Sequence, residues 1–173
     1  MPIERTDCYS IFLLPPHNEE EDFRRVIAHL ATKYDAPIFD PHITLISDLH
    51  GAEEALFDTL KNAAADLHAI PVSLIALESR DIWHRCLFAR AELTPELQRM
   101  QETIAKAFGK EPLPDFLPHI SLLYGDYPLE QKPAMAMEAG TYPHTFVANR
   151  LALCRGIGWP NEWRNVGECE LKL

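Results

Sequence analysis

The sequence lacks the features that mark disulfide-rich, secreted and membrane proteins. Its cysteines form no CxxC pair and stand mostly in apolar stretches, so we expect buried, reduced thiols at four positions: Cys8, Cys86, Cys154 and Cys169. No apolar run approaches the length of a membrane span. Residues 1–5 carry no basic segment followed by an apolar signal core. We therefore expect a cytoplasmic protein with no membrane partner.

Positive charge is also scarce. The chain of 173 residues holds 16 Lys and Arg against 26 Asp and Glu, which gives a formal net charge of -10. Proteins that bind a long polynucleotide backbone are typically basic. We therefore expect a small phosphorylated ligand and no long nucleic acid. The length and the hydrophobic content of 47% suit one core, so we expect a monomer with one domain over residues 1–173.

The sequence does contain a repeated motif, His-Ile-Thr-Leu at residues 42–45 and His-Ile-Ser-Leu at 119–122, each directly after a proline. In an extended strand, alternate side chains share a face, so each copy places its histidine and its hydroxyl on one side and two aliphatic residues on the other. Two such strands side by side would bring four polar residues into one cleft: His42, His119, Thr44 and Ser121. A pair of imidazoles with two short donors suits acid-base chemistry on a phosphate ester.

A structural role or a metal site could also account for the motif. Each histidine and hydroxyl could simply satisfy neighbouring backbone groups. The histidines could instead hold a metal ion, with Asp40 as a nearby carboxylate. No HExxH, CxxC or carboxylate cluster completes a ligand set, and hydroxyls are poor zinc ligands. We therefore expect catalysis with no metal and no cofactor, and structural roles for the remaining histidines: His17, His29, His50, His68, His84 and His144.

Hydrophobic periodicity predicts the same order of elements in both halves: helix, histidine strand, helix and then two strands. Helices are expected over residues 18–34 (Asn18 as N-cap), 52–67, 95–108 (after a Thr94 cap) and 129–139. Strands are expected over residues 8–14, at both motifs, and over 71–77, 82–91, 145–153 and 166–171. The two motif histidines lie 77 positions apart, close to half the chain. From this order we infer an internal duplication, in which the two halves of the chain are related by a pseudo-twofold axis and form a cleft between them.

The paired motifs resemble those of the 2H phosphoesterase superfamily, which is named for its two His-x-Thr/Ser repeats, and in particular its cyclic phosphodiesterase branch. Residues 121–124, 149–154 and the pair Glu162-Trp163 are also similar to plant members of that branch. The resemblance implies an α+β, bilobal fold, in which two antiparallel-sheet lobes with outer helices flank a central cleft. Plant relatives carry cysteine pairs that have no equivalent here, so their redox regulation is not expected.

The same resemblance implies a hydrolase of the phosphoric diester class. Its substrates would be ADP-ribose 1'',2''-cyclic phosphate, converted to ADP-ribose 1''-phosphate, and nucleoside 2',3'-cyclic phosphates, converted to 2'-phosphates. Thr44 and Ser121 would hold the non-bridging phosphate oxygens. One of His42 and His119 would be the base and the other the acid, and we favour His119 as the base because Tyr124 follows on its segment.

Two aromatic residues are further candidates for substrate contacts. Tyr124 is expected either to help hold the attacking water or to pack at a strand end. Trp83 is expected either to stack on adenine or to be partly buried between the lobes. Arg85 and Arg155 could supply positive charge near the phosphate, but we interpret both as surface arginines.

Other functions remain open at this point. Related enzymes of the superfamily act as RNA 2',5'-ligase-like proteins or trim RNA ends, which the acidic balance argues against. A non-catalytic nucleotide-binding module would not require both imidazoles. A purely structural protein would leave four polar residues at matched positions without a purpose.

Overall fold

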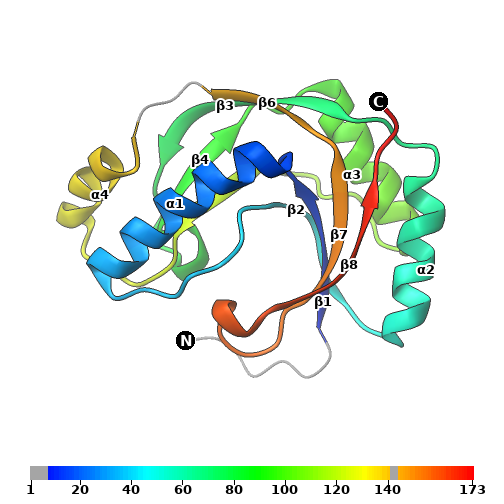
Figure 1. Ribbon diagram of the computed structural model, residues 1–173, viewed down its shortest axis with the longest axis horizontal. Helices are drawn as coiled ribbons and strands as arrows, with labels where there is room; N and C mark the ends of the chain where they lie inside the picture. The colour runs from blue at the N-terminus through cyan, green and yellow to red at the C-terminus, as the bar shows by residue number, and fades with distance from the viewer. Residues whose placement is uncertain (1–7, 141–143) are drawn as a thin grey trace.

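Eight strands and four α-helices alternate along residues 8–140 and 144–173, the part of the chain that the computed structural model describes (Figure 1). The strands are β1 (Tyr9–Leu14), β2 (Ile43–Leu49), β3 (Ile70–Glu78), β4 (Leu87–Ala91), β5 (His119–Leu123), β6 (His144–Ala148), β7 (Arg150–Arg155) and β8 (Arg164–Glu170). The α-helices are α1 (His17–Tyr34), α2 (Glu53–Ala64), α3 (Pro95–Ala107) and α4 (Lys132–Glu138). Short 3₁₀ turns lie at Trp83–Arg85 (η1), Leu129–Gln131 (η2) and Pro160–Glu162 (η3). The stretch 1–5, where no signal core was found, lies outside the described residues.

All eight strands belong to one antiparallel sheet in the order β6-β3-β4-β5-β2-β1-β7-β8. The sheet consists of two four-stranded halves, and β2 and β5 are the strands at which the halves meet. These two strands pair through a single residue pair, Ile43 with Ile120. The α+β architecture with two antiparallel lobes is therefore confirmed.

The helices cover one face of the sheet, and each lobe receives helices from both parts of the chain (Figure 1). Helix α1 follows β1 but packs against β5 of the other lobe, and α4 contacts β4 of that lobe. In the same way α3 follows β4 but packs against β2, beside α2 on β7 and β8. The apolar stripe of α1 (Phe23, Ile27 and Leu30) is buried in the main core. Crossing helices thus bind the two lobes together.

Two local predictions were wrong. Residues 145–153 do not form one strand: the chain breaks at Asn149 into β6, which pairs with β3, and β7, which pairs with β1 in the other lobe. Residues 82–86 do not extend a strand either, because Trp83–Arg85 forms the turn η1. In both places an apolar run conceals a change of direction, which periodicity alone does not report.

The predicted helix ends are confirmed in one case and wrong in another. Thr94 caps α3, since its hydroxyl oxygen accepts a hydrogen bond from the Leu97 backbone amide at 3.2 Å. Gly109 follows that helix with φ of 67°, a left-handed conformation that glycine adopts readily. Helix α1, however, begins at His17 after Pro16, with no side-chain cap. Asn18 is therefore inside the helix rather than at its cap.

None of the described cysteines forms a disulfide bond, and three of them are buried. No helix in residues 8–140 and 144–173 is long and apolar enough to cross a membrane.

Candidate active site

The register between β2 and β5 brings the two motifs face to face. Because Ile43 pairs with Ile120 in antiparallel sense, His42 comes opposite Ser121 and Thr44 opposite His119 on the adjoining positions. The two isoleucines point into the core and are fully buried. Alternation then places all four polar side chains on the other face of the sheet, away from the helices.

Both histidines are held in the same tautomer by the same backbone contact. The Nδ1 atom of His42 lies 2.7 Å from the carbonyl oxygen of Asp40, and Nδ1 of His119 lies 2.8 Å from the carbonyl oxygen of Leu117. A carbonyl only accepts hydrogen bonds, so each Nδ1 carries the hydrogen and donates it. Each ring therefore keeps Nε2 for a substrate or a water.

A phenylalanine from the neighbouring strand supports each histidine. Phe12 of β1 stacks on His42, with ring centroids 3.7 Å apart and planes inclined by 15°. Phe88 of β4 meets His119 edge to face at 4.9 Å. Phe12 pairs with Thr44 and Phe88 with Ser121 in the sheet, so the two supports occupy equivalent positions. Sequence analysis missed both, since the only signal was an aromatic residue at an alternate strand position.

Burial lowers the proton affinity of both rings. It brings the pKa of His42 down to about 4, helped by the neighbouring His119 and opposed by the carbonyl and the charge of Asp40. It also lowers the pKa of His119, where the Leu117 carbonyl opposes the shift and the electrostatic effects of Arg85 and His84 add to it. Both imidazoles are consequently neutral in the free protein at neutral pH.

The two hydroxyls differ in their surroundings. Ser121 is buried, and its Oγ donates to the carbonyl oxygen of His84 at 3.1 Å. Ser121 also opposes, in part, the burial that raises the pKa of Tyr124. Thr44 is half-buried and borders a hollow of about 710 Å³ whose other wall includes Lys110 and Leu113. Thr44 is therefore the hydroxyl with an open approach.

Tyr124 belongs to a group of aromatic residues at one end of the cleft. Its ring is 3% exposed and lies between Phe39, at 4.0 Å, and Trp83, at 5.2 Å. Burial raises its pKa far above the ordinary value. Trp83 is half-buried, with Trp159 tilted against it at 6.0 Å. Trp159 is 47% exposed, so this aromatic group also has a surface open to solvent.

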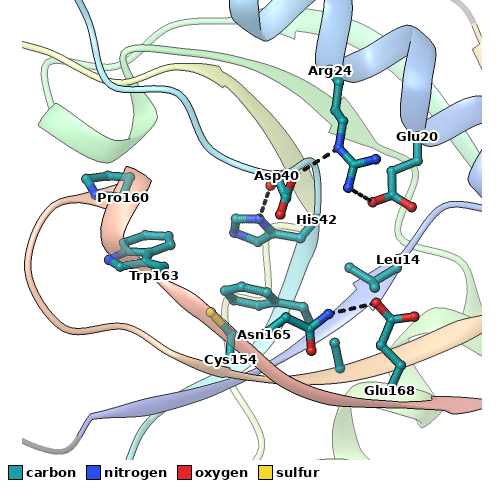
Figure 2. A pocket seen from close by; sticks show the side chains of 12 residues that line it. Leu14, Glu20, Arg24, Asp40, His42, Cys154, Pro160, Trp163, Asn165 and Glu168 are labelled. Carbon is teal, nitrogen blue, oxygen red and sulfur yellow. Dashed lines mark hydrogen bonds and ion pairs between the residues drawn. The ribbon is translucent and has the colours of Figure 1, made fainter.

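A pocket opens on the His42 side of the cleft (Figure 2). It has a volume of about 530 Å³, part of it open to solvent. Phe12, His42 and Trp163 form its aromatic side, and Asn165 and Glu168 of β8 also line it. Trp163 also approaches His42, with ring centroids 6.3 Å apart. The pocket thus extends from His42 to the β8 residues Asn165 and Glu168.

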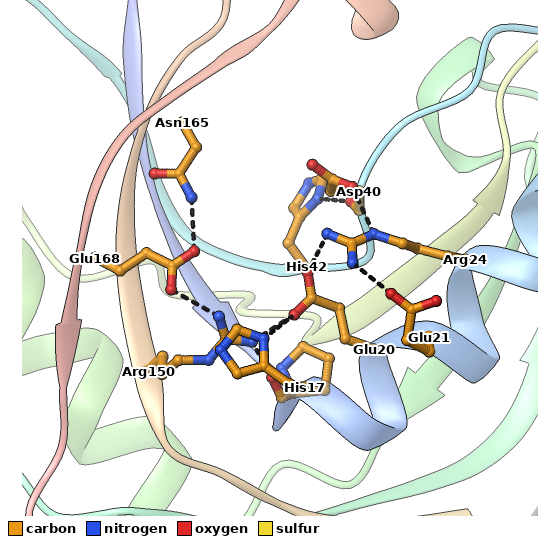
Figure 3. Close-up of polar contacts among 10 residues, drawn as sticks. His17, Glu20, Glu21, Arg24, Asp40, His42, Arg150, Asn165 and Glu168 are labelled. Atoms are coloured by element: carbon orange, nitrogen blue, oxygen red, sulfur yellow. Dashed lines mark hydrogen bonds and ion pairs between the residues drawn. The ribbon is translucent and has the colours of Figure 1, made fainter.

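An ion network that is buried at Arg150 and Glu20 ties α1 to this pocket and to the segment before His42 (Figure 3). Arg150 of β7, 4% exposed, contacts Glu20 of α1 at 2.5 Å and Glu168 of β8 at 2.6 Å. Glu20 also contacts Arg24 at 2.5 Å, and Arg24 in turn holds Asp40 at 2.9 Å. Because the Asp40 carbonyl orients His42, this network extends from β8 to the histidine.

Within the described ranges, no three His, Cys, Asp or Glu side chains gather closely enough to hold a metal ion. The two motif histidines are accompanied by hydroxyl and aromatic side chains.

The sequence matches a family model described as cyclic phosphodiesterase-like protein over residues 8–170. The chain belongs to this family. It is therefore a phosphodiesterase of the 2H phosphoesterase superfamily, as the paired motifs predicted. A curated relative, the cyclic phosphodiesterase of Arabidopsis thaliana, is 25% identical over 175 residues, spanning 96% of this chain and 97% of the relative.

Solved structures share the fold. LigT of E. coli, solved with 3'-AMP, has a TM-score of 0.62 and 12% identity, over 96% of this chain and 98% of LigT. TT0787 of Thermus thermophilus has a TM-score of 0.63 and 16% identity, over 95% and 98% of the two chains. Usb1 of Kluyveromyces marxianus is more distant, with a TM-score of 0.51 and 12% identity over 96% and 98%.

Removing the charge at the centre of the network should destabilise the fold. In Arg150→Met the side-chain volume is nearly kept, but Glu20 and Glu168 lose a buried partner, which should lower the free energy of unfolding by about 3 kcal/mol. Urea denaturation followed by circular dichroism measures it. The control is Arg25→Met, in an exposed pair with Asp22, which should change stability by less than about 0.5 kcal/mol. Equal effects of the two variants would contradict a structural role for the network.

Protonation of buried His42 should cost stability in acid. Its pKa is about 4 in the folded protein and about 6.5 when unfolded, so the unfolded state binds the proton first as the pH falls. Between pH 6.5 and pH 4.5 the wild type should therefore lose on the order of 2 kcal/mol more than His42→Asn. Urea titrations of both proteins at several pH values give the difference, and parallel curves would show that His42 is not buried in its neutral form.

Proposed function

We propose that this phosphodiesterase hydrolyses small cyclic phosphates without a metal ion, namely ADP-ribose 1'',2''-cyclic phosphate and nucleoside 2',3'-cyclic phosphates. The observation that carries the proposal is the β2–β5 register, which puts two Nδ1-protonated imidazoles and two hydroxyls on one face. The Arabidopsis relative is named a cyclic phosphodiesterase, and the E. coli neighbour of the same fold is solved with 3'-AMP, ATP and NADP+. Small nucleotides are consistent with these findings and with a net charge of -10.

In the proposed reaction His119 is the base and His42 the acid. With the anionic substrate bound, His42 first takes up a proton from solvent on Nε2. Nε2 of His119 then takes a proton from a water, whose oxygen forms the new bond to phosphorus, while Nε2 of His42 gives its proton to the departing ribose oxygen. For a nucleoside 2',3'-cyclic phosphate the bond to the 3' oxygen breaks, and the product is the 2'-phosphate. Proton exchange with solvent then restores both rings.

The charges around the two rings support this assignment. In the free protein burial lowers the pKa of His42 strongly, but a bound substrate would also bury the more accessible His119 and so reduce that difference. The anionic phosphate would raise the pKa of both rings. What then distinguishes them is their neighbours: Asp40 favours a proton on His42, whereas Arg85 and His84 disfavour one on His119.

Thr44 and Ser121 are proposed to hydrogen-bond the non-bridging oxygens, on which negative charge accumulates in the transition state. Tyr124 is buried, and Ser121 partly offsets the rise in its pKa, so its proposed part in the site would act through that serine and the attacking water. Trp83 is proposed to stack on the base of the substrate, beside the exposed ring of Trp159.

The reaction and its metal independence can be tested together by phosphorus NMR. The purified protein is incubated with EDTA and either 2',3'-cyclic AMP or ADP-ribose 1'',2''-cyclic phosphate. We expect a monoester from each, with the phosphate on the 2' oxygen for the first. Turnover of neither substrate, in folded protein, would refute the proposal, and RNA-end substrates would be the next to examine; binding without product would indicate a nucleotide-binding module.

Removing either imidazole should abolish most of the turnover. His42→Asn and His119→Asn should each lower kcat by about 10²- to 10⁴-fold, because each loses one proton-transfer group. The control is His29→Asn, an exposed histidine that contacts Glu138 on the outer helices, and it should retain full activity. Near-normal kcat in both motif variants, with native circular dichroism, would exclude the two-histidine mechanism.

Loss of the indole should weaken recognition of the base and leave the chemistry intact. Trp83→Ala should reduce the affinity for adenosine 2'-monophosphate by roughly 5- to 100-fold, from a stacking energy of about 1–3 kcal/mol, as measured by calorimetric titration. Trp83→Phe keeps an aromatic face and should lose much less. Hydrolysis of a ribose cyclic phosphate without a base should be unaffected, and an equal loss there would contradict base stacking.

A further inference from the structure

Arg85 is an arginine to which the described part of this strongly acidic protein supplies no partner. Seven other arginines each form at least one ion pair: Arg24, Arg25, Arg80, Arg90, Arg99, Arg150 and Arg164. Arg85 forms no ion pair and no side-chain hydrogen bond with any residue that the structure describes. It is half-buried, and its Nε atom is buried with no hydrogen-bond partner among those residues. A buried donor left unsatisfied carries a free-energy cost of about 1–3 kcal/mol.

The backbone that carries Arg85 is firmly held beside the two motifs. Arg85 ends the turn η1, and both its amide and its carbonyl are hydrogen-bonded, to Ile82 and Arg80, at 2.9 Å each. The same turn is joined to β5 by two further bonds: Ser121 donates to the His84 carbonyl at 3.1 Å, and the Gly125 amide donates to the Trp83 carbonyl at 2.9 Å. The guanidinium charge lies close enough to His119 to lower the pKa of that ring.

The bond from Ser121 also affects what that serine can offer to a phosphate. A hydroxyl has one hydrogen, and in the free protein that of Ser121 is donated to the His84 carbonyl. To donate to a substrate, Ser121 must first give up this contact. Thr44 has no such commitment to any described residue. On the His119 side of the cleft, Arg85 is thus the charged donor that already lacks a partner.

We propose that Arg85 is a third phosphate-binding residue, whose guanidinium binds a non-bridging oxygen of the cyclic phosphate on the Ser121 side of the site. Ser121 then has a second task, which is to fix the turn that carries Trp83 and Arg85 to β5. This inference rests on the proposed function. It also accounts for attraction of an anionic substrate by a chain of net charge -10, because one unpaired cation in a cleft creates a local positive potential.

The test compares Arg85→Gln with Arg85→Lys and with a matched control, Arg80→Gln. Arg80 lies in the same β3–β4 connection and its loss changes the net charge equally, but its side chain is exposed and contacts Glu78. Arg85→Gln should lower kcat/KM for 2',3'-cyclic AMP by about 10- to 100-fold, the contribution of a charge-assisted hydrogen bond. Arg85→Lys should recover part of this loss, and Arg80→Gln should stay within about twofold of the wild type.

Three readouts separate phosphate binding from a merely structural role. Inorganic phosphate, titrated by phosphorus NMR, should bind more weakly to Arg85→Gln but not to Arg80→Gln. Removing the positive charge should also raise the pKa of His119, so activity that needs neutral His119 should begin to fall at a higher pH on the acid side. Added guanidinium ion should restore part of the activity of Arg85→Ala, a rescue that a folding defect would not show.

The outcomes are distinguishable from a failure of the proposed function. If the wild type hydrolyses neither cyclic substrate, the proposed function is wrong, and the phosphate titration still decides the role of Arg85. If Arg85→Gln equals Arg80→Gln in phosphate affinity and kcat/KM, the inference is overturned. A loss confined to ADP-ribose 1'',2''-cyclic phosphate would also overturn it, since Arg85 would then contact a distant phosphate of that substrate.

Discussion

The pairing of β2 with β5 is the constraint on which the site depends. It rests on one residue pair, Ile43 with Ile120, yet it joins the two lobes and sets the relative positions of all four motif residues. A shift of one residue would turn one strand's histidine and hydroxyl toward the core. Contacts on both faces of the sheet reinforce this register. The two isoleucines are buried in the core, and on the other face the neighbouring strands β1 and β4 bring Phe12 and Phe88 against the histidines. The crossing helices α1 and α3 hold the two lobes at this junction.

The packing that orders the histidines also opposes their charged forms. Stacking orders the rings and burial lowers their pKa values, so the free protein holds two neutral imidazoles where the proposed reaction needs an acid and a base. An anionic substrate would reverse part of that shift. One histidine would thus become protonated only when the substrate binds. The empty site would therefore transfer protons poorly. The acidic side chains near His42 are mostly neutralised by Arg24 and Arg150, so they do not simply repel a phosphate.

The two lobes are similar at the histidines and different around them. In both rings the Nδ1–H group donates a hydrogen bond to the carbonyl two residues earlier, and both rings contact a phenylalanine. Hydrolysis, however, requires a water on one side of phosphorus and a leaving group on the other. The surroundings supply that asymmetry: Asp40 lies at His42, Arg85 at His119, and the tryptophans at one end only. In the proposed reaction a symmetric core would position the phosphate, and asymmetric loops would give the reaction its direction.

The sequence by itself determined the family, the α+β class and the two motifs, because period-two alternation and a repeated pentapeptide are local properties of the chain. It also placed the Thr44 and Ser121 hydroxyls on the histidine face and predicted the cap at Thr94. The break at Asn149, the turn at Trp83–Arg85 and the burial of Tyr124 were decided only by tertiary structure, since each depends on which distant strand a segment pairs with. The partners of Arg90, Arg150 and Arg164 are likewise distant in the sequence. Arg85, interpreted from sequence as a surface residue, is half-buried because folding brings η1 against β5, and it is unpaired because no carboxylate of residues 8–140 and 144–173 lies within its reach.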